Sequence, residues 1–206
     1  MGKNNLNKCR FCRREGMKLF LKGDRCHTAG KCPIEKRKLI KSKNMKMKDY
    51  GIQLREKQKI KRYYGMMENQ FRNMYDKAAR KDGITGDNLL ILCERRLDNV
   101  VYRMKLAKSR AEARQLVNHG MFTINGKKID IPSHLVRVND EISLTSAGKR
   151  NKKLSETIEI NQNELPDVEW LRFDFTQKKG SILKDPVRSD ITMTFNEQLV
   201  VELYSK

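Results

Sequence analysis

Four cysteines stand near the N-terminus of this 206-residue chain, as a C-x2-C pair followed by a wider C-x5-C pair. Two close pairs of thiolates joined by a loop are typical of a closed tetrahedral zinc site. In such a site four protein ligands leave no position for a catalytic water. The spacing therefore predicts one structural zinc ion, held by Cys9, Cys12, Cys26 and Cys32.

Other interpretations of these four thiols stay open. The second pair is wider than the usual two to four intervening residues, so His27 could replace one thiolate. An iron–sulfur cluster, or ligand-free cysteines that oxidise only as an artefact, would use the same residues. Disulfides are disfavoured because thiols in the cytosol are kept reduced. The fifth cysteine, Cys93, lies on an apolar stripe, where we expect a small buried hydrophobe.

Positive charge exceeds what solubility requires, with 45 Lys and Arg against 25 Asp and Glu. The charge is concentrated at the front, where residues 1–62 hold 21 Lys and Arg against 5 Asp and Glu. Such segregation indicates a polyanionic partner, either a nucleic acid or an anionic membrane. A metal ion near the N-terminus would fold a basic arm that has no core of its own. The candidate phosphate contacts in this arm are Arg10, Arg13, Arg14, Lys18 and Lys22.

Several classes of protein are excluded by what the sequence lacks. No apolar run approaches the roughly 20 residues of a membrane helix, and the first 20 residues lack a signal peptide's apolar core. Phosphate-binding loops, dinucleotide fingerprints, nucleophile elbows and H-E-x-x-H motifs are absent. The Arg-Leu-Asp that ends at Asp98 is similar to a catalytic motif of pseudouridine synthases, but it falls within an expected helix. We expect a cytoplasmic protein that is no enzyme, with no membrane partner and no small-molecule substrate.

The hydrophobic pattern divides the chain into an arm and two folded parts. Apolar residues in the segment 1–48 recur with neither a helical nor a strand period. We expect this segment to be extended or loosely ordered except where a bound metal fixes it. Residues 49–95 are expected to form a helical domain, with 181–206 packed against it. A helix break is predicted at Gly65, and a further helix from Asp87 to Met104. The buried stripe of this part is predicted to contain Ile60, Tyr64, Met67, Phe71, Met74 and Ala78.

Residues 96–180 are expected to form a small module of helix and antiparallel strands. Ser109 and Glu112 make a predicted capping box, and Gly120 ends the short helix that follows. Asn125-Gly126 predicts a type I′ hairpin between MFTI and KKIDI. A further strand pair is expected from HLVRV and EISL.

Two basic helix faces are left for solvent or phosphate. Arg110 and Arg114, four residues apart, are expected to share the helix face opposite the core. The other face belongs to the helical domain and contains Arg55, Lys57, Lys59, Lys61 and Arg62.

Three collinear stretches that cover nearly the whole chain resemble a known family, the bacterial-type ribosomal small-subunit protein four (S-four) family. They are KDYGIQLREKQKIKRYYGMMENQFRNMYDKA, GDNLLILCERRLDNVVYRMKLAKSRAEARQLVNHGMFTINGKKI and the ending FNEQLVVELYSK. The resemblance implies an α+β protein with an extended, zinc-pinned basic arm, a helical domain and an RNA-binding domain from about Arg96 to Leu144. It also implies a structural component of the bacterial ribosome. A free regulatory RNA-binding protein, a translational repressor or antitermination factor, is the alternative.

The resemblance implies partners and contact residues as well. Family members bind the 5′ domain of small-subunit ribosomal RNA early in assembly, contact small-subunit protein five and lie where mRNA enters the subunit. Zinc-bearing members have four N-terminal cysteines, which correspond to the zinc ligands predicted above. RNA-contacting residues of the family correspond here to Tyr50, Gln53, Arg55, Lys57, Arg62, Ser109, Arg110, Arg114, Asn118 and His119. Residues that face mRNA in the family correspond, by charge only, to Lys43, Lys46 and Lys48.

Two segments depart from the family pattern. Members usually carry Pro-Gly-Gln-His-Gly between the zinc region and the DYG helix, whereas KRKLIKSKNMKMK stands at that place in this chain. Cys26 and Cys32 are also one residue further apart than the family pattern predicts.

Overall fold

The structure is a computed structural model that describes residues 7–36, 48–161, 166 and 168–205. Its internal contacts divide the chain into two compact units, Met1–Leu90 with Met193–Lys206, and Ile91–Thr192. We call them the helical unit and the sheet unit and describe each by itself. Their boundary falls within one helix, α6 (Thr85–Glu94).

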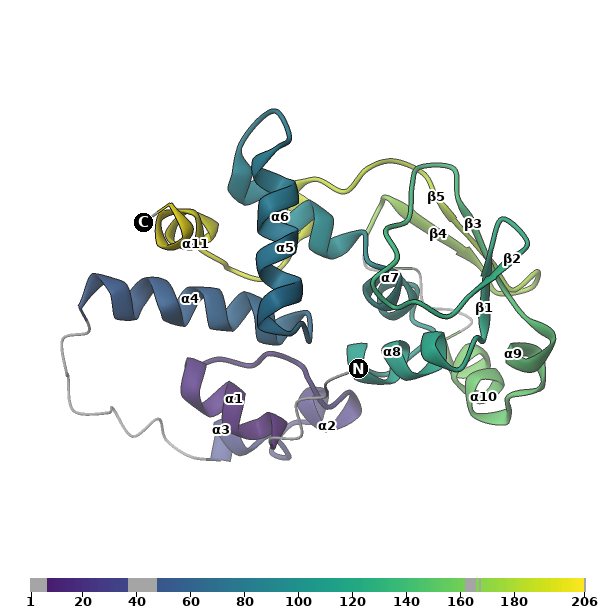
Figure 1. Cartoon of the computed structure of the whole chain (residues 1–206). Helices are drawn as coiled ribbons and strands as arrows, with labels where there is room; N and C mark the ends of the chain where they lie inside the picture. Colours follow the sequence, from purple (N-terminus) through teal and green to yellow (C-terminus); the bar gives the residue numbers. More distant parts are fainter. Residues whose placement is uncertain (1–6, 37–47, 162–165, 167, 206) are drawn as a thin grey trace. The chain divides into compact units, whose positions relative to one another are not determined.

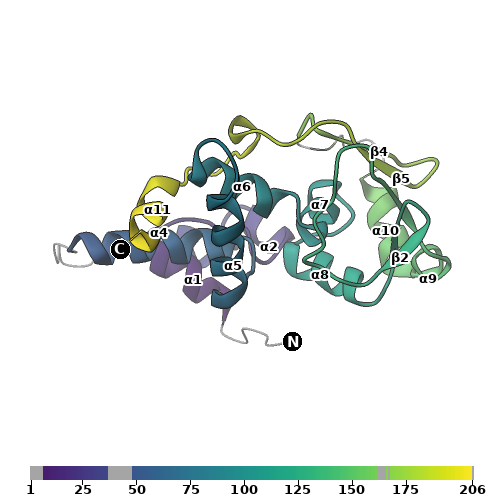
Figure 2. The same ribbon diagram turned by 45° about the horizontal axis from the view of Figure 1, so that its top comes forward.

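In the helical unit the last helix of the chain packs against a much earlier one. Its last helix lies beside α4 (Figures 1 and 2), although about 140 residues separate the two in the sequence. The amide of Asn196, which precedes this helix, donates to Glu56 Oε1 of α4 at 2.9 Å. Besides the first part of α6, the helices of this unit are α1 (Lys8–Glu15), α2 (Asp24–His27), α3 (Pro33–Lys36), α4 (Asp49–Tyr63), α5 (Glu68–Ala79) and α11 (Glu197–Tyr204).

Residues 7–36 of the N-terminal arm are not extended, which corrects the expectation from the sequence for this part of the arm. Its described part forms the short helices α1, α2 and α3, and Phe11 and Leu19 are buried within it. Asn7 caps α1 by accepting a hydrogen bond from the Cys9 amide at 3.2 Å, and Gly16 ends that helix with a φ of 69°. Helices of eight, four and four residues are too short to give a hydrophobic period.

The apolar stripe of the helical unit is confirmed except at one position. Met67 is 40% exposed, because it precedes α5 in extended conformation and does not lie on a helix face. The break at Gly65 is confirmed, with a φ of 66°. The stripe residues that are buried are Ile60, Tyr64, Phe71, Met74 and Ala78.

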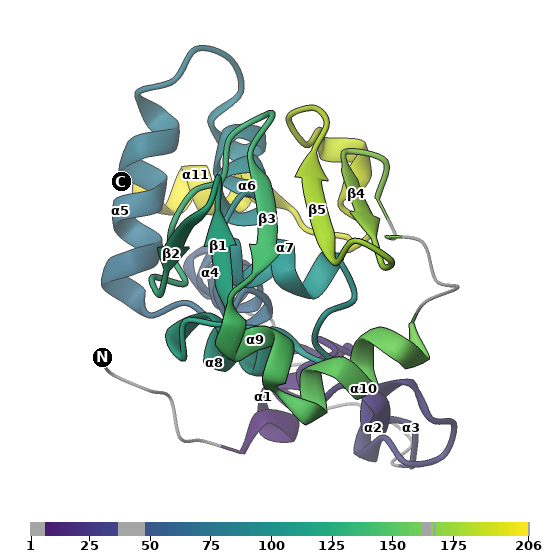
Figure 3. The same cartoon turned by 90° about the vertical axis from the view of Figure 1, so that its right-hand side faces the viewer.

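The sheet unit is an antiparallel sheet with helices packed against it (Figure 3). The strands are ordered β2-β1-β3-β5-β4, and every neighbouring pair is antiparallel. Mixed helical and antiparallel-sheet architecture is therefore confirmed. The elements are α7 (Leu97–Arg103), α8 (Arg110–Asn118), β1 (Phe122–Ile124), β2 (Lys127–Ile129), β3 (Glu141–Leu144), α9 (Ser146–Arg150), α10 (Lys152–Ile160), β4 (Leu171–Asp174), β5 (Lys179–Ile182) and the 3-10 turn η1 (Arg188–Asp190).

Local signals set the ends of α8 and the first hairpin as expected. The Ser109 hydroxyl accepts from the Glu112 amide at 3.3 Å, while the Glu112 carboxylate accepts from the Lys108 amide at 3.0 Å, one residue before the amide that the expected capping box would use. Gly120 follows α8 with a φ of 65°. Asn125-Gly126 has φ values of 50° and 78°, as a type I′ turn requires.

Two expectations about the sheet unit are wrong, for one physical reason. The expected helix Asp87–Met104 is two helices, α6 and α7, because Arg96 is extended and pairs with Leu135 in an isolated β-bridge. The Leu97 amide also donates to the His134 carbonyl at 2.8 Å. The HLVRV segment therefore fixes this break and forms no strand, while the EISL strand β3 pairs with β1 and β5.

The connection from β3 through α9 to α10 is held tightly against the end of α8. A Cβ atom added to Gly148 would lie 2.4 Å from the Met121 carbonyl oxygen. The Thr145 hydroxyl donates to the Gly120 carbonyl at 3.0 Å and accepts from the Gly148 amide at 3.0 Å. This close approach fixes where α9 leaves the sheet.

We predict that Gly148→Ala destabilises the sheet unit by about 1–3 kcal/mol, because the added methyl group meets backbone that cannot move away. Urea unfolding followed by the fluorescence of Trp170, which is fully buried in the sheet unit, measures the effect. Ala147→Ser at the exposed neighbouring position is the control. Equal unfolding midpoints for the two variants would contradict the prediction.

Candidate nucleic-acid interface

The four N-terminal cysteines come together in the helical unit. Cys9, Cys12, Cys26 and Cys32 line one small cavity, and all but Cys9 are buried. The Lys22 amide donates to Cys26 Sγ at 3.4 Å. Within the described residues, however, no three His, Cys, Asp or Glu side chains are arranged to hold a metal ion.

Burial shapes the chemistry of these thiols. Desolvation raises the pKa of Cys12, although a hydrogen bond from the Leu19 amide lowers it. The neighbouring Cys26, Cys9 and Cys32 sulfurs raise it further, because adjacent thiolates repel one another. His27 is exposed and its ring stacks on Phe20, with ring centroids 5.0 Å apart. Cys93 is fully buried, as expected, and burial raises its pKa to about 12.

Most predicted phosphate contacts of the arm are exposed. Lys18 differs because it forms an ion pair with Glu35, which raises the pKa of Lys18 and lowers that of Glu35. The carboxylate therefore holds the Lys18 ammonium on the protein's own surface. The exposed members are Arg10, Arg13, Arg14 and Lys22.

One buried carboxylate ties the arm to α4. The Glu15 side chain is only 1% exposed, and it accepts from Arg62 Nη1 and lies 3.5 Å from Arg55 Nη1. The Arg62 guanidinium also lies over the Phe11 ring, 4.7 Å from its centroid. Burial lowers the pKa of Arg62, and Glu15 opposes this change. Arg55 and Arg62 are thus held in fixed positions by the arm.

A second carboxylate, Glu68, binds two lysines of α4. Lys57 Nζ and Lys61 Nζ donate to its two oxygens at 2.5 and 2.6 Å. The Tyr204 hydroxyl donates to Glu68 Oε1 at 3.2 Å, and Lys57 lies 5.4 Å from the centre of the Tyr204 ring. Burial raises the pKa of Glu68, but the two lysines outweigh it and lower the value to about 2.

The remaining predicted contacts of α4 differ in accessibility. Tyr50 is 61% exposed and Lys48 is exposed, so both are available to a partner. Gln53 is buried, and its Nε2 donates to Glu202 Oε2 of α11 at 3.0 Å. Lys43 and Lys46 lie outside the described residues.

In the sheet unit Arg110 does not lie on the face opposite the core, which corrects the expectation. It is only 7% exposed, its Nε donates to Asn99 Oδ1 at 2.7 Å, and its guanidinium lies 4.5 Å from the centre of the Tyr102 ring. Asn99 in turn donates to Glu94 at 2.6 Å, and Glu94 accepts two hydrogen bonds from Arg103 at 3.0 and 2.8 Å. Arg110 completes this buried network.

Arg114, one turn further along α8, is partly exposed. Its Nη1 is 3.6 Å from Asp98 Oδ2, while Arg96 binds both Asp98 oxygens at 3.1 and 2.7 Å. Burial lowers the pKa of Arg114 and Asp98 opposes this. Ser109 caps α8 with its hydroxyl, and Asn118 and His119 are exposed at the opposite end of that helix. Arg114, Asn118 and His119 are thus the accessible members of the predicted set on α8.

Sequence reasoning missed the carboxylates that position these cations. Counting charge treats an acidic residue only as a reduction of the basic surface. The structure shows instead that each of them fixes one or two cations. The sequence does contain a signal for two of them. Acidic residues alternate with arginines along α6 and α7, and an acidic residue that is buried there must be paired with a cation. The residues concerned are Glu15, Glu68, Glu94 and Asp98.

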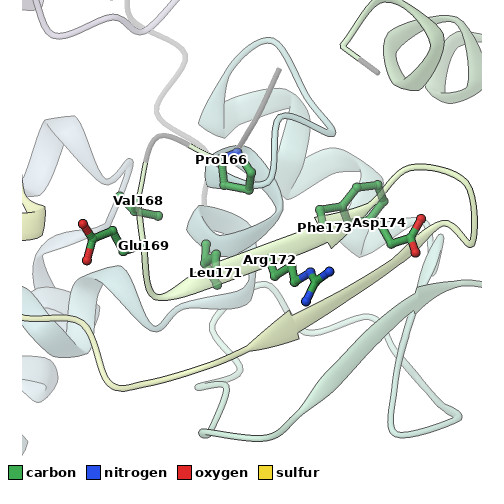
Figure 4. Close-up of a pocket in the computed structure, with 7 residues that line it drawn as sticks. All are labelled: Pro166, Val168, Glu169, Leu171, Arg172, Phe173 and Asp174. Atoms are coloured by element: carbon green, nitrogen blue, oxygen red, sulfur yellow. The ribbon is translucent and has the colours of Figure 1, made fainter. Parts of the chain in front are cut away.

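A hollow of about 470 Å³ lies at the edge strand β4 of the sheet unit (Figure 4). Leu171 and Phe173 of β4 are buried, and Arg172 and Asp174 alternate with them on the exposed face. Pro166, Val168 and Glu169 complete the lining. Its lining residues offer no pairing of a nucleophile with a base.

Comparison with known proteins covers almost the whole chain. Residues 3–94 match the family described as ribosomal protein S4/S9 N-terminal domain, and residues 95–142 match the S4 domain. The small ribosomal subunit protein uS4 of Syntrophomonas wolfei is 53% identical over 211 aligned positions, covering 100% of both chains. The proteins of the same name from Desulfitobacterium hafniense and Clostridioides difficile are 52% and 51% identical, each covering 96% of both chains. In the described part of the chain, none of the helices combines the length and apolar character needed to cross a bilayer.

We predict that Glu68→Gln destabilises the helical unit by about 1 kcal/mol at pH 7, a value discounted for the partial exposure of this carboxylate. Because the folded-state pKa lies below the ordinary 4.5, the ionised carboxylate stabilises the fold above that pH. The advantage disappears as the pH falls towards 2. Urea titrations at pH 7, 4.5 and 3 measure the difference in unfolding free energy between the wild type and the variant.

The matched control for this prediction is Asp76→Asn, an exposed carboxylate on the same helix. We expect a change within about 0.5 kcal/mol at each pH. If Glu68→Gln cost as much at pH 3 as at pH 7, the ionised pairs with Lys57 and Lys61 would not be its source of stability.

Proposed function

The chain belongs to the uS4 family of small-subunit ribosomal proteins, which are structural proteins and not enzymes, and on this premise we propose that it binds the 5′ domain of small-subunit ribosomal RNA early in assembly. The observation that carries the proposal is a collinear match of more than 50% identity along the entire chain. Because the aligned relatives cover both the helical unit and the sheet unit, the proposal concerns the chain as a whole.

The proposed mechanism is that of a preformed scaffold. Arg55 and Arg62 are held by Glu15, and Arg114 is held beside Asp98. Cations fixed in this way meet phosphates with little loss of side-chain entropy on binding. Phosphate contacts supply affinity, and the fixed positions of the cations within each unit favour a folded RNA junction, since structured RNA is recognised largely by shape.

We also propose contacts with small-subunit protein five and with incoming mRNA. The support for both is the family resemblance, together with the exposed Lys48 immediately before α4. Lys43 and Lys46 would contribute to the mRNA contact by charge. The corresponding location of the protein is the ribosome, in the bacterial cytoplasm.

We propose that the four N-terminal cysteines hold one structural zinc ion. The support is the donor set: all four thiols line one cavity, and amides donate to the sulfurs of Cys12 and Cys26, although the described side chains are not arranged around an ion. Bound zinc would supply folding energy to the arm and no reaction chemistry, since four thiolates complete its coordination. Because α1 carries both Cys12 and Glu15, the ion would also help to fix Arg55 and Arg62.

Binding to a 5′-domain fragment of small-subunit ribosomal RNA tests the function. We expect the wild-type chain to protect a helical junction from hydroxyl radicals and to prefer this RNA to a 3′-domain fragment of equal length. Arg114→Gln should lower the slope of log affinity against log salt by about 0.7–0.9, which corresponds to one phosphate contact. Lys178→Gln is the control with equal charge change.

Equal affinity for both fragments would contradict the proposed function. Tight RNA binding by a protein that is absent from purified small subunits would favour the regulatory alternative.

Elemental analysis of the purified protein tests the zinc proposal. We expect about one zinc per chain, lost in Cys12→Ser and kept in Cys93→Ala. Amide hydrogen exchange should accelerate in α1 when zinc is removed, because metal binding stabilises a segment with a small core. A metal-free protein with fully protected α1 would contradict the proposal.

A further inference from the structure

A compact group of cations lies where α9 meets α10 in the sheet unit, outside the surfaces described above. Lys149 and Arg150 end α9, and Lys152 and Lys153 begin α10. All four side chains are exposed. We call these four residues the α9–α10 corner.

The corner is rigidly built. Asn151 ends α9 and begins α10, and its Oδ1 accepts from the Leu154 amide at 3.0 Å. Leu154 and Ile158 anchor α10 in the core of the sheet unit, each 1% exposed. On the other side, Gly148 is packed against the Met121 carbonyl. Figure 3 shows α9 and α10 next to α8 at one end of the sheet.

Two of the four charges are placed where they oppose helix formation. Lys152 and Lys153 occupy the first turn of α10, which contains no acidic residue. Cations at a helix N-terminus oppose the helix dipole, and four cations within five residues repel one another. Lys149 and Arg150 suit the C-terminal end of α9, whereas Lys152 has no such compensation at the start of α10. A polyanionic partner would offset the cost.

The corner also differs from the basic face of α4 in how its charges are paired. On α4, Lys57 and Lys61 are bound to Glu68. At the corner only Lys153 has an acid partner, Glu112 of α8, at 2.7 Å. For Lys149, Arg150 and Lys152, the residues that the structure describes place no carboxylate within ion-pair distance. The ammonium and guanidinium groups therefore face solvent.

A fifth cation, Lys128 of the β1–β2 hairpin, lies over the end of α8. An added Cβ at Gly120 would be 2.2 Å from Lys128 Cε and 2.9 Å from its Nζ. Gly120 is hydrogen-bonded to Thr145, which caps α9. Positive charge thus continues from the corner to the C-terminal end of α8, where Asn118 and His119 are exposed.

We propose that the α9–α10 corner is a second phosphate-binding site, which holds the sugar-phosphate backbone of the RNA that α8 contacts. The inference rests on the proposed function, since it takes RNA as the partner. Lysine and arginine without interleaved aromatic residues suit phosphate oxygens and provide no platform for bases. The corner therefore adds affinity and orientation without sequence readout.

The test is a triple variant, Lys149→Gln with Arg150→Gln and Lys152→Gln. Lys153 is left in place because it is paired with Glu112. We expect the slope of log affinity against log salt, measured on the 5′-domain RNA fragment, to fall by about 2. Equivalently, the affinity advantage of the wild type shrinks about 16-fold between 50 and 200 mM salt. Hydroxyl-radical protection should be lost over one short RNA segment and kept elsewhere.

The matched control removes three cations from the β4–β5 region, as Arg172→Gln with Lys178→Gln and Lys184→Gln. We expect its salt slope to stay within about 0.5 of the wild type. Trp170 fluorescence in urea checks folding, and the corner variant and the control should both unfold in one cooperative transition, as the wild type does. Lys152→Gln alone, with an expected slope change of about 0.7–0.9, serves as a second variant.

Equal slopes and equal footprints for the corner variant and the control would overturn the inference while leaving the proposed function intact. Failure of the wild-type chain to bind the fragment would overturn both.

Discussion

Mutual repulsion among cations is the constraint on which the rest of this structure depends. A chain with 45 Lys and Arg and 25 Asp and Glu cannot neutralise its charge by pairing every cation with an acid. Its described part instead buries a few carboxylates and gives each several donors. Glu94 accepts from Arg103 and Asn99, and Asp98 accepts from Arg96 through both oxygens. A buried carboxylate that lost such partners would cost about 3–5 kcal/mol, so these arrangements are tightly fixed.

Fixed cations have a direct consequence for recognition of RNA. A lysine or arginine that moves freely loses conformational entropy when it grips a phosphate, whereas one already held by a carboxylate loses less. The same pairing weakens the cation's electrostatic pull, because part of its charge is balanced. Arg62, Lys57 and Lys61 are cations held by a carboxylate. The cations of the α9–α10 corner keep more of their electrostatic pull, because most of them have no such partner. The protein combines positioned contacts on α4 and α8 with strongly attractive ones at the α9–α10 corner.

Features that depend on a few neighbouring residues could be predicted from the sequence. The left-handed Gly65 and Gly120, the Asn125-Gly126 turn and the Ser109 cap are all where local rules place them. Each of these features is decided within a few residues of chain, so distant contacts do not alter it. The grouping of four cysteines around one cavity was also foreseeable from their spacing.

Features that depend on distant residues were missed. Helical periodicity places Arg110 beside Arg114, but it cannot show that the Arg110 guanidinium reaches Asn99 and Tyr102 on α7. The split between α6 and α7 depends on a bridge from Arg96 to Leu135, nearly 40 residues away. The ion pairs of α4 with Glu15 and Glu68 likewise join separate elements. Charge counts give the class of partner, while only the folded chain shows which cations are positioned by acids.

The central claim is that the cations of α4 and α8 are preformed for binding, with Arg55, Arg62 and Arg114 fixed before any partner binds. Amide hydrogen exchange of the full-length protein, free and bound to the 5′-domain RNA fragment, tests this claim most directly. The account predicts strong protection of α4, α7 and α8 in the free protein, with little further protection on binding. Rapid exchange of these helices in the free protein, followed by protection only when RNA is added, would contradict it.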